Sequence, residues 1–507
     1  MDYRASLILG GLLVLLLKSL LGAWRRYPLR LPYPPGPPPR FFVGNHREIP
    51  TVLPWLTYTE WGRQYGDLVH ARTFGQHVIL VNSVETAAEL LEKRAHIYSD
   101  RPVLPMMELM GWDFNTGLLP YGNRWRGHRK MLQRHFRRDV AQIYRPIQMK
   151  KVHAFLRGLL ATPQEFRNLF QTVAAAIIVS AVYGHEIEPA NDHFVTLSER
   201  AVQKLSEAFF PGAVAVNAIP ILRYLPGWLP GCGFQGFAAE CRQLTQEMQE
   251  VPFNFAKGNM QEGLDSKSVV AKLLEAGRAQ GNCDEQMIQE VAAVSYTAGS
   301  DTTASSLGSF FLAMAVHPDA QKKAQREIDS VVGTHRLPEF EDRPSLPFVE
   351  ALFRELMRWR PVLPLGVSHA TTTDDVYEGY YIPKGAMVIS NIWAMTRNEA
   401  IYPEPDRFNP DRFFTAEGDL NDDDTILTFG FGRRICPGRH TADASVWCTI
   451  VSVLATFDIA KAKDANGNEI DIDPVYSDGL VSHPEPFVCS ITPRSDKARD
   501  LVQATEL

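Results

Sequence analysis

Cys436 lies in a segment whose composition points to chemistry. The segment is FGFGRRICPG, from Phe429 to Gly438, and it places one cysteine among glycines, two arginines and a proline. Glycines permit backbone conformations that other residues avoid, and they allow close approach to a flat ligand. A proline suits the first helical turn, and the apolar segment that follows predicts a helix. Cys436 is therefore expected at a helix N-terminus, where the dipole and free N–H groups favour a thiolate.

Three interpretations of this thiolate are compatible with the residues around it. It could be a nucleophile, a metal ligand, or a buried cysteine in a purely structural turn. A nucleophile requires a base as partner, and the local segment offers none. Spacing alone does not separate the metal ligand from the structural turn.

Asp301 and Thr302 form a second candidate group, in the sequence AGSDTT. Ser300 and Asp301 could cap a new helix that starts after Gly299. However, apolar periodicity continues on both sides, which favours one long helix over residues 286–317. Inside such a helix a glycine beside threonine hydroxyls can loosen the hydrogen-bond ladder, because threonine bonds back to carbonyls.

A basic segment, RWRGHRKMLQRHFRR, covers residues 124–138 and contains no acidic residue. Nucleic acid or anionic lipid is one interpretation, and a solvated basic helix is the other. Trp125 and Arg129 are four residues apart, so they share one helix face.

Glu355 and Arg358 lie one helical turn apart in the sequence ELMR. Most pairs of this kind are solvated surface pairs of little energetic weight. Glu355 shares a face with Leu352 and Trp359, however, so we expect the pair to be partly buried.

The segment around Cys436 resembles the haem-binding signature of the cytochrome P450 family, Phe-x-x-Gly-x-Arg-x-Cys-x-Gly. Phe429, Gly432, Arg434, Cys436 and Gly438 occupy its five fixed positions. The resemblance implies that Cys436 is the axial thiolate ligand of haem b. It also implies that Arg434 pairs with a haem propionate, while Phe429 and Gly438 belong to the haem-binding loop.

The resemblance extends to the other motifs, in the family's order along nearly the whole chain. AGSDTT is similar to the family's oxygen-binding segment, so Thr302 is implied to hold water and dioxygen, and Asp301 to relay protons. The Trp-x-x-x-Arg of Trp125 and Arg129 is implied to reach the haem propionates. His369 occupies a position where relatives place a further propionate ligand, although the preceding Ser368 departs from the proline often found there.

Three charged residues are implied to form a structural brace behind the cysteine loop, without a catalytic role: Glu355, Arg358 and the Arg407 of a PDRF sequence. The substrate walls are implied to be mainly apolar, which favours a lipophilic substrate held by shape. By resemblance they come from the 104–114 loop and from Tyr296, Thr297, Val362, Leu363, Pro364, Leu365 and Leu480.

The elements needed to position these residues are mostly helical. Two short strands are expected within residues 51–100, helices dominate from about 120 to 330, and strands joined by turns are expected over 370–392. No β-α-β rhythm occurs, which excludes a doubly wound sheet. The resemblance implies the cytochrome P450 fold, a mainly α helical prism with small β-sheets and a buried haem.

The N-terminal residues predict a membrane anchor. Residues 5–24 are apolar except for Lys18 and Ser19, and about 20 such residues span a bilayer. The arginines that follow place the body of the protein in the cytosol by the positive-inside rule. A cleaved signal peptide is the alternative, but no clear cleavage site precedes the arginines. We therefore expect an N-terminal transmembrane helix over 5–24, a basic and proline-rich hinge over 25–40, and one cytosolic catalytic domain over 41–507.

Composition narrows the class of function. The 507 residues are 45% hydrophobic and carry a formal net charge of −6, which suits a globular protein and argues against nucleic acid as the main partner. Six cysteines without a CxxC pair predict free thiols in a reducing compartment. A single-pass protein of the endoplasmic reticulum membrane, facing the cytosol, fits these features.

The implied activity is a haem-thiolate monooxygenase that inserts one oxygen atom of O2 into a lipophilic small molecule. Such a reaction belongs to secondary metabolism or detoxification, and the resemblance is strongest to membrane-anchored fungal members of the family. Electrons would come from NADPH through a separate cytochrome P450 reductase, with cytochrome b5 as a further electron donor, since the chain has no dinucleotide-binding motif. The alternatives are a haem-thiolate isomerase or dehydratase that needs no external electrons, and a haem sensor without catalysis.

Overall fold

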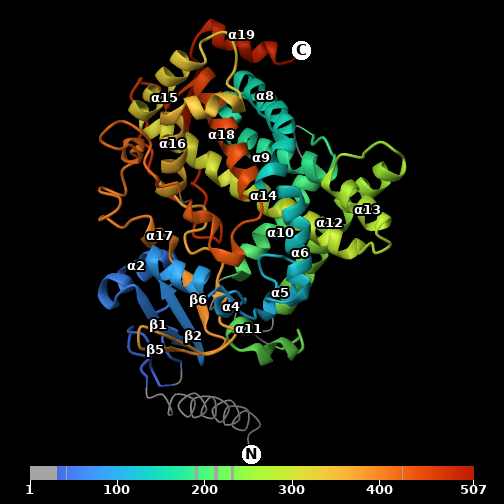
Figure 1. Ribbon diagram of the computed structural model, residues 1–507, viewed down its shortest axis with the longest axis vertical. Coiled ribbons are helices and arrows are strands. Elements are labelled where there is room, and N and C mark those ends of the chain that lie inside the picture. The colour runs from blue at the N-terminus through green and yellow to red at the C-terminus, as the bar shows by residue number, and fades with distance from the viewer. Residues whose placement is uncertain are drawn as a thin grey trace, which may run out of the picture.

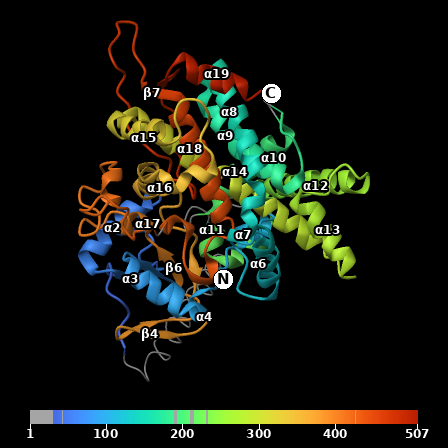
Figure 2. The ribbon, with the colours of Figure 1, turned by 45° about the horizontal axis from the view of Figure 1, so that its top comes forward.

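The computed structural model describes residues 31–41, 43–188, 192–209, 215–229, 233–424 and 426–506. The anchor predicted over 5–24 and most of the hinge lie outside these residues. Within them the chain is mainly helical, with small sheets at opposite ends of the helical body, as Figures 1 and 2 show. The mixture of a helical body and small sheets agrees with the expectation from the sequence.

The largest sheet contains four strands in the order β1-β2-β6-β3. β1 (Leu68–Thr73) pairs antiparallel with β2 (Gln76–Val81), which pairs parallel with β6 (Met387–Ser390), and β3 (His369–Ala370) pairs antiparallel with β6. The sheet therefore joins segments about 300 residues apart in sequence and fixes the 362–369 segment beside the N-terminal part of the chain. The two-stranded sheets are β4 (Asp375–Tyr377) with β5 (Tyr380–Ile382), and β7 (Phe457–Lys461) with β8 (Cys489–Pro493).

The longest helix, α14, runs from Glu285 to Val316 through the middle of the molecule (Figure 1). The Asp284 side chain caps it by accepting a hydrogen bond from the Met287 N–H at 3.0 Å. The helix continues without a break through Gly299, so Ser300 and Asp301 do not start a new helix. Gly299 lies against Ile178 of α9 (Phe166–Tyr183), where a Cβ would come within 3.0 Å of that side chain.

The main core forms where α14 packs against its neighbours. These are α8 (Arg145–Ala161), α9, α16 (Pro347–Trp359) and α18 (Arg439–Thr456). Among the described residues, the segment containing α9 is apolar and long enough to span a membrane by composition. Most of it is buried against α14 and α8, so its apolar character is explained by the core.

The remaining helices surround this core. Their bounds are α2 (Pro54–Tyr65), α3 (Val84–Ala87), α4 (Ala95–Tyr98), α5 (Pro105–Leu109), α6 (Asn123–Phe136), α7 (Arg138–Ala141), α10 (His193–Phe209), α11 (Ala215–Ala218), α12 (Phe234–Gln261), α13 (Val269–Ala279), α15 (Pro318–Val331), α17 (Ile392–Met395) and α19 (Asp496–Ala504). The short helix α19 follows β8.

Candidate active site

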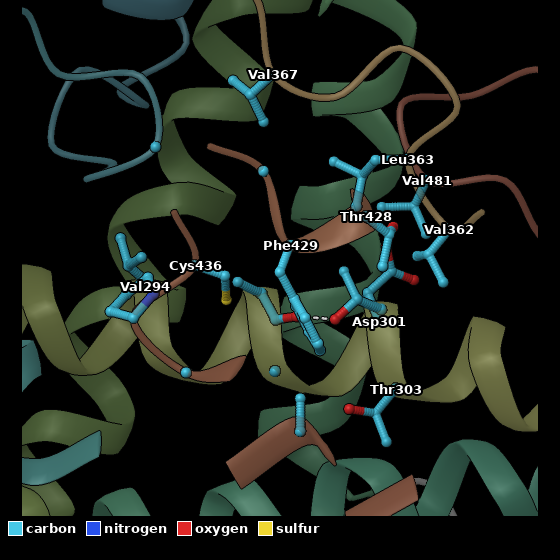
Figure 3. A pocket seen from close by; sticks show the side chains of 18 of the residues that line it. Val294, Asp301, Thr303, Val362, Leu363, Val367, Thr428, Phe429, Cys436 and Val481 are labelled. Carbon is cyan, nitrogen blue, oxygen red and sulfur yellow. Dashed lines mark hydrogen bonds between the residues drawn. The ribbon is translucent and has the colours of Figure 1, made fainter. Parts of the chain in front are cut away.

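A cavity of about 350 Å³ lies between α14 and the loop that carries Cys436 (Figure 3). Its size is within the range of small-molecule sites. The walls come from α6, α9, α10 and α14, from the 362–369 segment, and from the start of α18. The cavity thus brings together all the chemical motifs of the sequence except the Glu355–Arg358 pair.

Cys436 is held at this cavity by a tightly turned loop. Its N–H donates to the Phe429 carbonyl at 2.8 Å, and α18 begins three residues later with Gly438 as its N-cap. Gly432 has φ +52°, and a Cβ there would lie 2.1 Å from the Leu91 carbonyl oxygen. This position therefore requires glycine on both conformational and steric grounds.

Two opposing influences act on the Cys436 thiol. Burial raises its pKa, whereas the Gly438 N–H and the guanidinium groups of Arg129 and Arg439 oppose that rise. The donors and positive charges are those that stabilise a thiolate ligand of a metal. Among the described residues, the groups that act on the Cys436 thiol are backbone N–H groups and arginines, and no carboxylate or imidazole that could activate it as a nucleophile is among them.

Arg434 occupies the cavity wall beside Cys436. Its Nε donates to the Ser99 carbonyl at 2.8 Å and its Nη2 to the Leu119 carbonyl at 2.9 Å, while the guanidinium stacks 4.5 Å from the Trp125 ring centroid. Burial lowers the pKa of Arg434 to about 10. Arg129, one turn after Trp125 on α6, also lines the cavity, and burial lowers its pKa as well.

His369 and Arg101 complete this group of cationic and polar side chains. His369 contacts the Tyr98 carbonyl through Nδ1 at 2.7 Å, and burial, followed by the charge of Arg101, holds its pKa well below the usual range. Arg101 donates to the carbonyls of Gly117, Val367 and Ser368. No sequence pattern selects Arg101, because it lies in an extended segment without a distinguishing spacing.

The charge balance of this wall suits a ligand with two carboxylates. Arg101, Arg129 and Arg434 are buried or half-buried there. One carboxylate oxygen of the nearby Asp100 accepts hydrogen bonds from the backbone N–H groups of Arg101 and Tyr121. Buried charges require compensation by opposite charge. A flat ligand with two carboxylates, whose metal ion a thiolate can coordinate, meets that requirement. The residues therefore fit haem b.

The opposite wall of the cavity is formed by α14. Asp301 and Thr302 both line it, and Figure 3 labels Asp301 on this helix. The Thr302 hydroxyl donates to the Ala298 carbonyl at 2.7 Å, and the Asp301 carboxylate pairs with His483 Nε2 at 3.0 Å. The hydroxyl and the carboxylate predicted for proton delivery thus lie in the same cavity as Cys436.

The predicted brace has one different member. Glu355 is fully buried and binds Arg358 at 2.6 and 2.9 Å, but its third charged partner is Arg412, at 3.2 Å. Arg407, predicted for this role, is exposed and pairs with Glu404 instead. The sequence PDRF occurs twice, at 405–408 and 410–413, and the structure selects the second copy.

Only some of the residues predicted for the substrate walls line this cavity. Thr297, Val362, Leu363 and Leu480 line it. Tyr296 does not: it is fully buried on another face of α14, against Tyr183. Leu365 and Pro364 face a separate, smaller cavity of about 90 Å³, which also reaches Leu104 and Leu480.

Of the predicted 104–114 loop, Trp112 lines the cavity. α10 also contributes Val202 and Leu205, which no pattern in the sequence indicated. The hydroxyls of Ser295 and Thr297 donate back to carbonyls of their own helix, so they present apolar faces. The cavity above Cys436 is therefore mainly apolar.

Comparison with known proteins gives a consistent result. The family model described as Cytochrome P450 matches residues 34–491. The chain is 40% identical to the Cytochrome P450 monooxygenase COX1 of Coprinopsis cinerea over 498 residues, which cover 96% of each chain. It is also 40% identical to the Cytochrome P450 monooxygenase 208 of Postia placenta, covering 97% of each chain, and to the Cytochrome P450 monooxygenase ple1 of Rhodocybe pseudopiperita, covering 94% of this chain and 92% of the other.

Proposed function

The chain belongs to the cytochrome P450 family of monooxygenases, and from this premise we propose that it inserts one oxygen atom of O2 into a lipophilic small molecule. One observation carries the proposal: Cys436 and the Asp301–Thr302 pair border the same apolar cavity. When bound, haem supplies the activation of dioxygen and the oxidising chemistry. The chain's own residues supply the binding, the orientation and the protons.

Each group has a defined task in this proposal. Cys436 would ligate the haem iron, and Arg101, Arg129, Arg434 and His369 would hold the haem carboxylates. Thr302 can turn its hydroxyl from the Ala298 carbonyl toward water in the cavity, and Asp301 passes protons to that water. The apolar wall excludes bulk water, so that protons arrive by this route rather than at random.

The acid–alcohol pair favours a monooxygenase over the alternatives. A haem-thiolate isomerase or dehydratase needs neither external electrons nor protons delivered at α14, and a haem sensor does not need them either. Asp301 and Thr302 are both present at the cavity, and the relatives compared are named monooxygenases. We place the reaction in secondary metabolism or detoxification.

The electron donor is proposed to be an NADPH-dependent flavoprotein reductase, with cytochrome b5 as a further donor. Arg126, Lys130, Arg134 and Arg137 are exposed on α6 and just after it, next to the helix face that carries Arg129. An acidic partner would be attracted to this surface. It lies close to the Cys436 side of the cavity, because Arg129 acts on the Cys436 thiol.

We propose that the protein resides in the endoplasmic reticulum membrane, anchored by residues 5–24, with its catalytic domain in the cytosol. Exposed apolar side chains support membrane contact at one end of the body. Ile221, Tyr224 and Trp228 follow α11, and Phe41 lies near the start of the described chain. α11 and the N-terminal strands share the lower end of the molecule in Figure 1.

The spectrum of the dithionite-reduced holoprotein with carbon monoxide tests this proposal. Thiolate ligation predicts a strongly red-shifted Soret band, and Cys436→Ser should abolish that band while leaving the fold intact by circular dichroism. A wild-type band at the position of histidine-ligated haem would contradict the proposal. If the red-shifted band is observed, the holoprotein is then incubated with a library of lipophilic compounds. An oxygenated product that forms only with NADPH and reductase would distinguish a monooxygenase from an isomerase or a sensor.

A further inference from the structure

The loop of residues 476–484 lies along α14 and is attached to it at three successive turns. The contacts in order along the helix are Asp301–His483, Ser305–Ser482 and Ser309–Tyr476, at 3.0, 2.6 and 3.0 Å. Positions four residues apart share one helix face, so the loop covers a single stripe of α14. Pro484 adds a close contact, since a Cβ at Gly308 would lie 2.9 Å from its ring.

The tip of this loop belongs to the cavity wall. Leu480 and Val481 line the cavity, and the Ser482 N–H donates to the carbonyl of Val362, another wall residue, at 2.9 Å. His483 therefore links the helix that carries the acid–alcohol pair to the wall that a substrate would touch. The contact between His483 and Asp301 is an ion pair when the imidazole is protonated.

Both partners of this pair are partly accessible. The side chain of His483 is 27% exposed and that of Asp301 is 28% exposed. Asp301 also faces the cavity, so the pair connects solvent with the cavity through two titratable groups. A histidine is the side chain that takes up and releases protons near neutral pH.

The other titratable groups around Asp301 do not replace His483. Glu199 of α10 is the second group that interacts with it: partial burial, then repulsion by the Asp301 carboxylate, raises the pKa of Glu199. α9 presents the apolar Ile178 to this part of α14. Asp478 within the loop and Glu485 just after it are acids, so neither can form an ion pair with the Asp301 carboxylate.

We propose that His483 is a positioning residue for proton delivery, which orients the Asp301 carboxylate and recharges it with protons from solvent; this inference rests on the proposed function. The Nε2 proton passes to Asp301 as the other ring nitrogen takes a proton from solvent. Asp301 then passes a proton to water beside Thr302. Rotation of the partly exposed ring restores the starting tautomer, so each cycle moves one proton from solvent to the cavity.

Two substitutions separate this role from simple anchoring of the loop. His483→Gln retains an N–H donor for Asp301 but cannot be recharged, whereas His483→Phe removes both functions. His335→Gln, at an exposed turn far along the chain, is the matched control. The holoenzyme is assayed with reductase, NADPH and 7-ethoxycoumarin as a lipophilic probe, recording oxygen consumption, peroxide release and the solvent isotope effect from about pH 6 to about pH 9.

If His483 relays protons, His483→Gln and His483→Phe should both slow oxygen consumption about tenfold. This loss is smaller than that expected for removing a general acid, because water can partly replace the histidine. Both should raise the solvent isotope effect and flatten the pH profile, and added imidazole should restore turnover to His483→Gly. His335→Gln should match the wild type. If His483→Gln keeps the wild-type rate and pH profile while His483→Phe does not, the histidine is only an anchor and the proposal is overturned.

A second measurement is independent of turnover. A double-mutant cycle with Asp301→Asn and His483→Gln measures their coupling in the unfolding midpoint of the holoprotein. The pair predicts coupling that is larger at about pH 6 than at about pH 8, because imidazole is charged only on the acid side. Additive effects of the two substitutions at both pH values would overturn the proposed role of His483, whatever the carbon monoxide spectrum shows. A spectrum without the red-shifted Soret band would instead contradict the proposed function.

Discussion

Arg129 illustrates how single residues prepare the site for its cofactor. It extends from α6 into the cavity, where its charge acts on the Cys436 thiol and burial lowers its own pKa. A guanidinium placed in this way is destabilised until a carboxylate neutralises it. A ligand that carries carboxylates therefore gains binding energy by neutralising this buried charge.

Arg129→Leu should therefore weaken haem retention. A charge-assisted hydrogen bond contributes about 1.5–3 kcal/mol, so we expect roughly tenfold or greater loss of haem affinity. The measurement is the ratio of Soret to protein absorbance after dialysis against apomyoglobin as a haem acceptor. Arg126→Leu, on the exposed face of the same helix, is the control, and equal haem loss in both variants would contradict the assignment.

Helical spacing predicted some side chains of the site and would have excluded others. The four-residue separation of Trp125 and Arg129 predicted one shared helix face, and both side chains line the cavity. In α14 the same rule places Thr297 and Asp301 on one helix face and Tyr296 on another, in agreement with the structure. Arg101 could not be found in this way, because an extended segment with long-range contacts has no local pattern.

At the scale of elements, the brace behind the cysteine loop shows why a motif alone can mislead. Both PDRF copies offer an arginine after an irregular segment, so sequence does not distinguish them. The structure does, because the side chain of Arg412 is 7% exposed beside the buried Glu355, whereas that of Arg407 is 67% exposed. The Asn409 N–H also donates to Glu355 at 2.7 Å, which fixes the second copy in place.

Arg412→Ala should destabilise the protein far more than Arg407→Ala. Removing one partner from a buried ion pair costs about 3 kcal/mol or more, since the remaining charge loses compensation. An exposed pair contributes about 0–1 kcal/mol. Urea unfolding of the two holoproteins measures the difference, and a larger loss for Arg407→Ala would restore the original assignment.

The cysteine loop makes a sharper demand on backbone conformation. Gly430 and Gly432 both have positive φ, at +77° and +52°, but only at Gly432 does a Cβ meet another atom, the Leu91 carbonyl oxygen. Leu91 belongs to a π-helical segment, Ala88–Lys93, which the sequence did not predict. The loop is thus seated on an irregular turn of a distant part of the chain.

Gly432→Ala should displace the loop and abolish haem incorporation, because a Cβ at 2.1 Å cannot be accommodated without backbone movement. Gly430→Ala incurs only conformational strain, of about 1–3 kcal/mol, and should still bind haem. The carbon monoxide spectrum of the two purified variants distinguishes them. A normal spectrum for Gly432→Ala would show that the contact between the loop and Leu91 is dispensable.

At the scale of the whole molecule, two different exposed surfaces serve the proposed function. Trp228, Tyr224 and Ile221 are each more than two-thirds exposed, which is costly in water unless another surface covers them. The basic surface belongs to another element, α6, which also carries Arg129 toward the Cys436 loop. A membrane contact at the first surface leaves the second free for an electron donor.

A chain that lacks residues 1–30 should therefore still bind lipid vesicles through its folded body. Inserting an exposed apolar side chain yields about 1.5–3 kcal/mol, so the double substitution Ile221→Asp, Trp228→Asp should reduce vesicle binding at least tenfold. Cosedimentation with phosphatidylcholine vesicles measures this, and Val488→Asp, at another exposed apolar position, is the control. If the truncated chain does not bind vesicles at all, membrane attachment depends on the N-terminal segment alone, and the apolar residues after α11 must be covered by another protein surface.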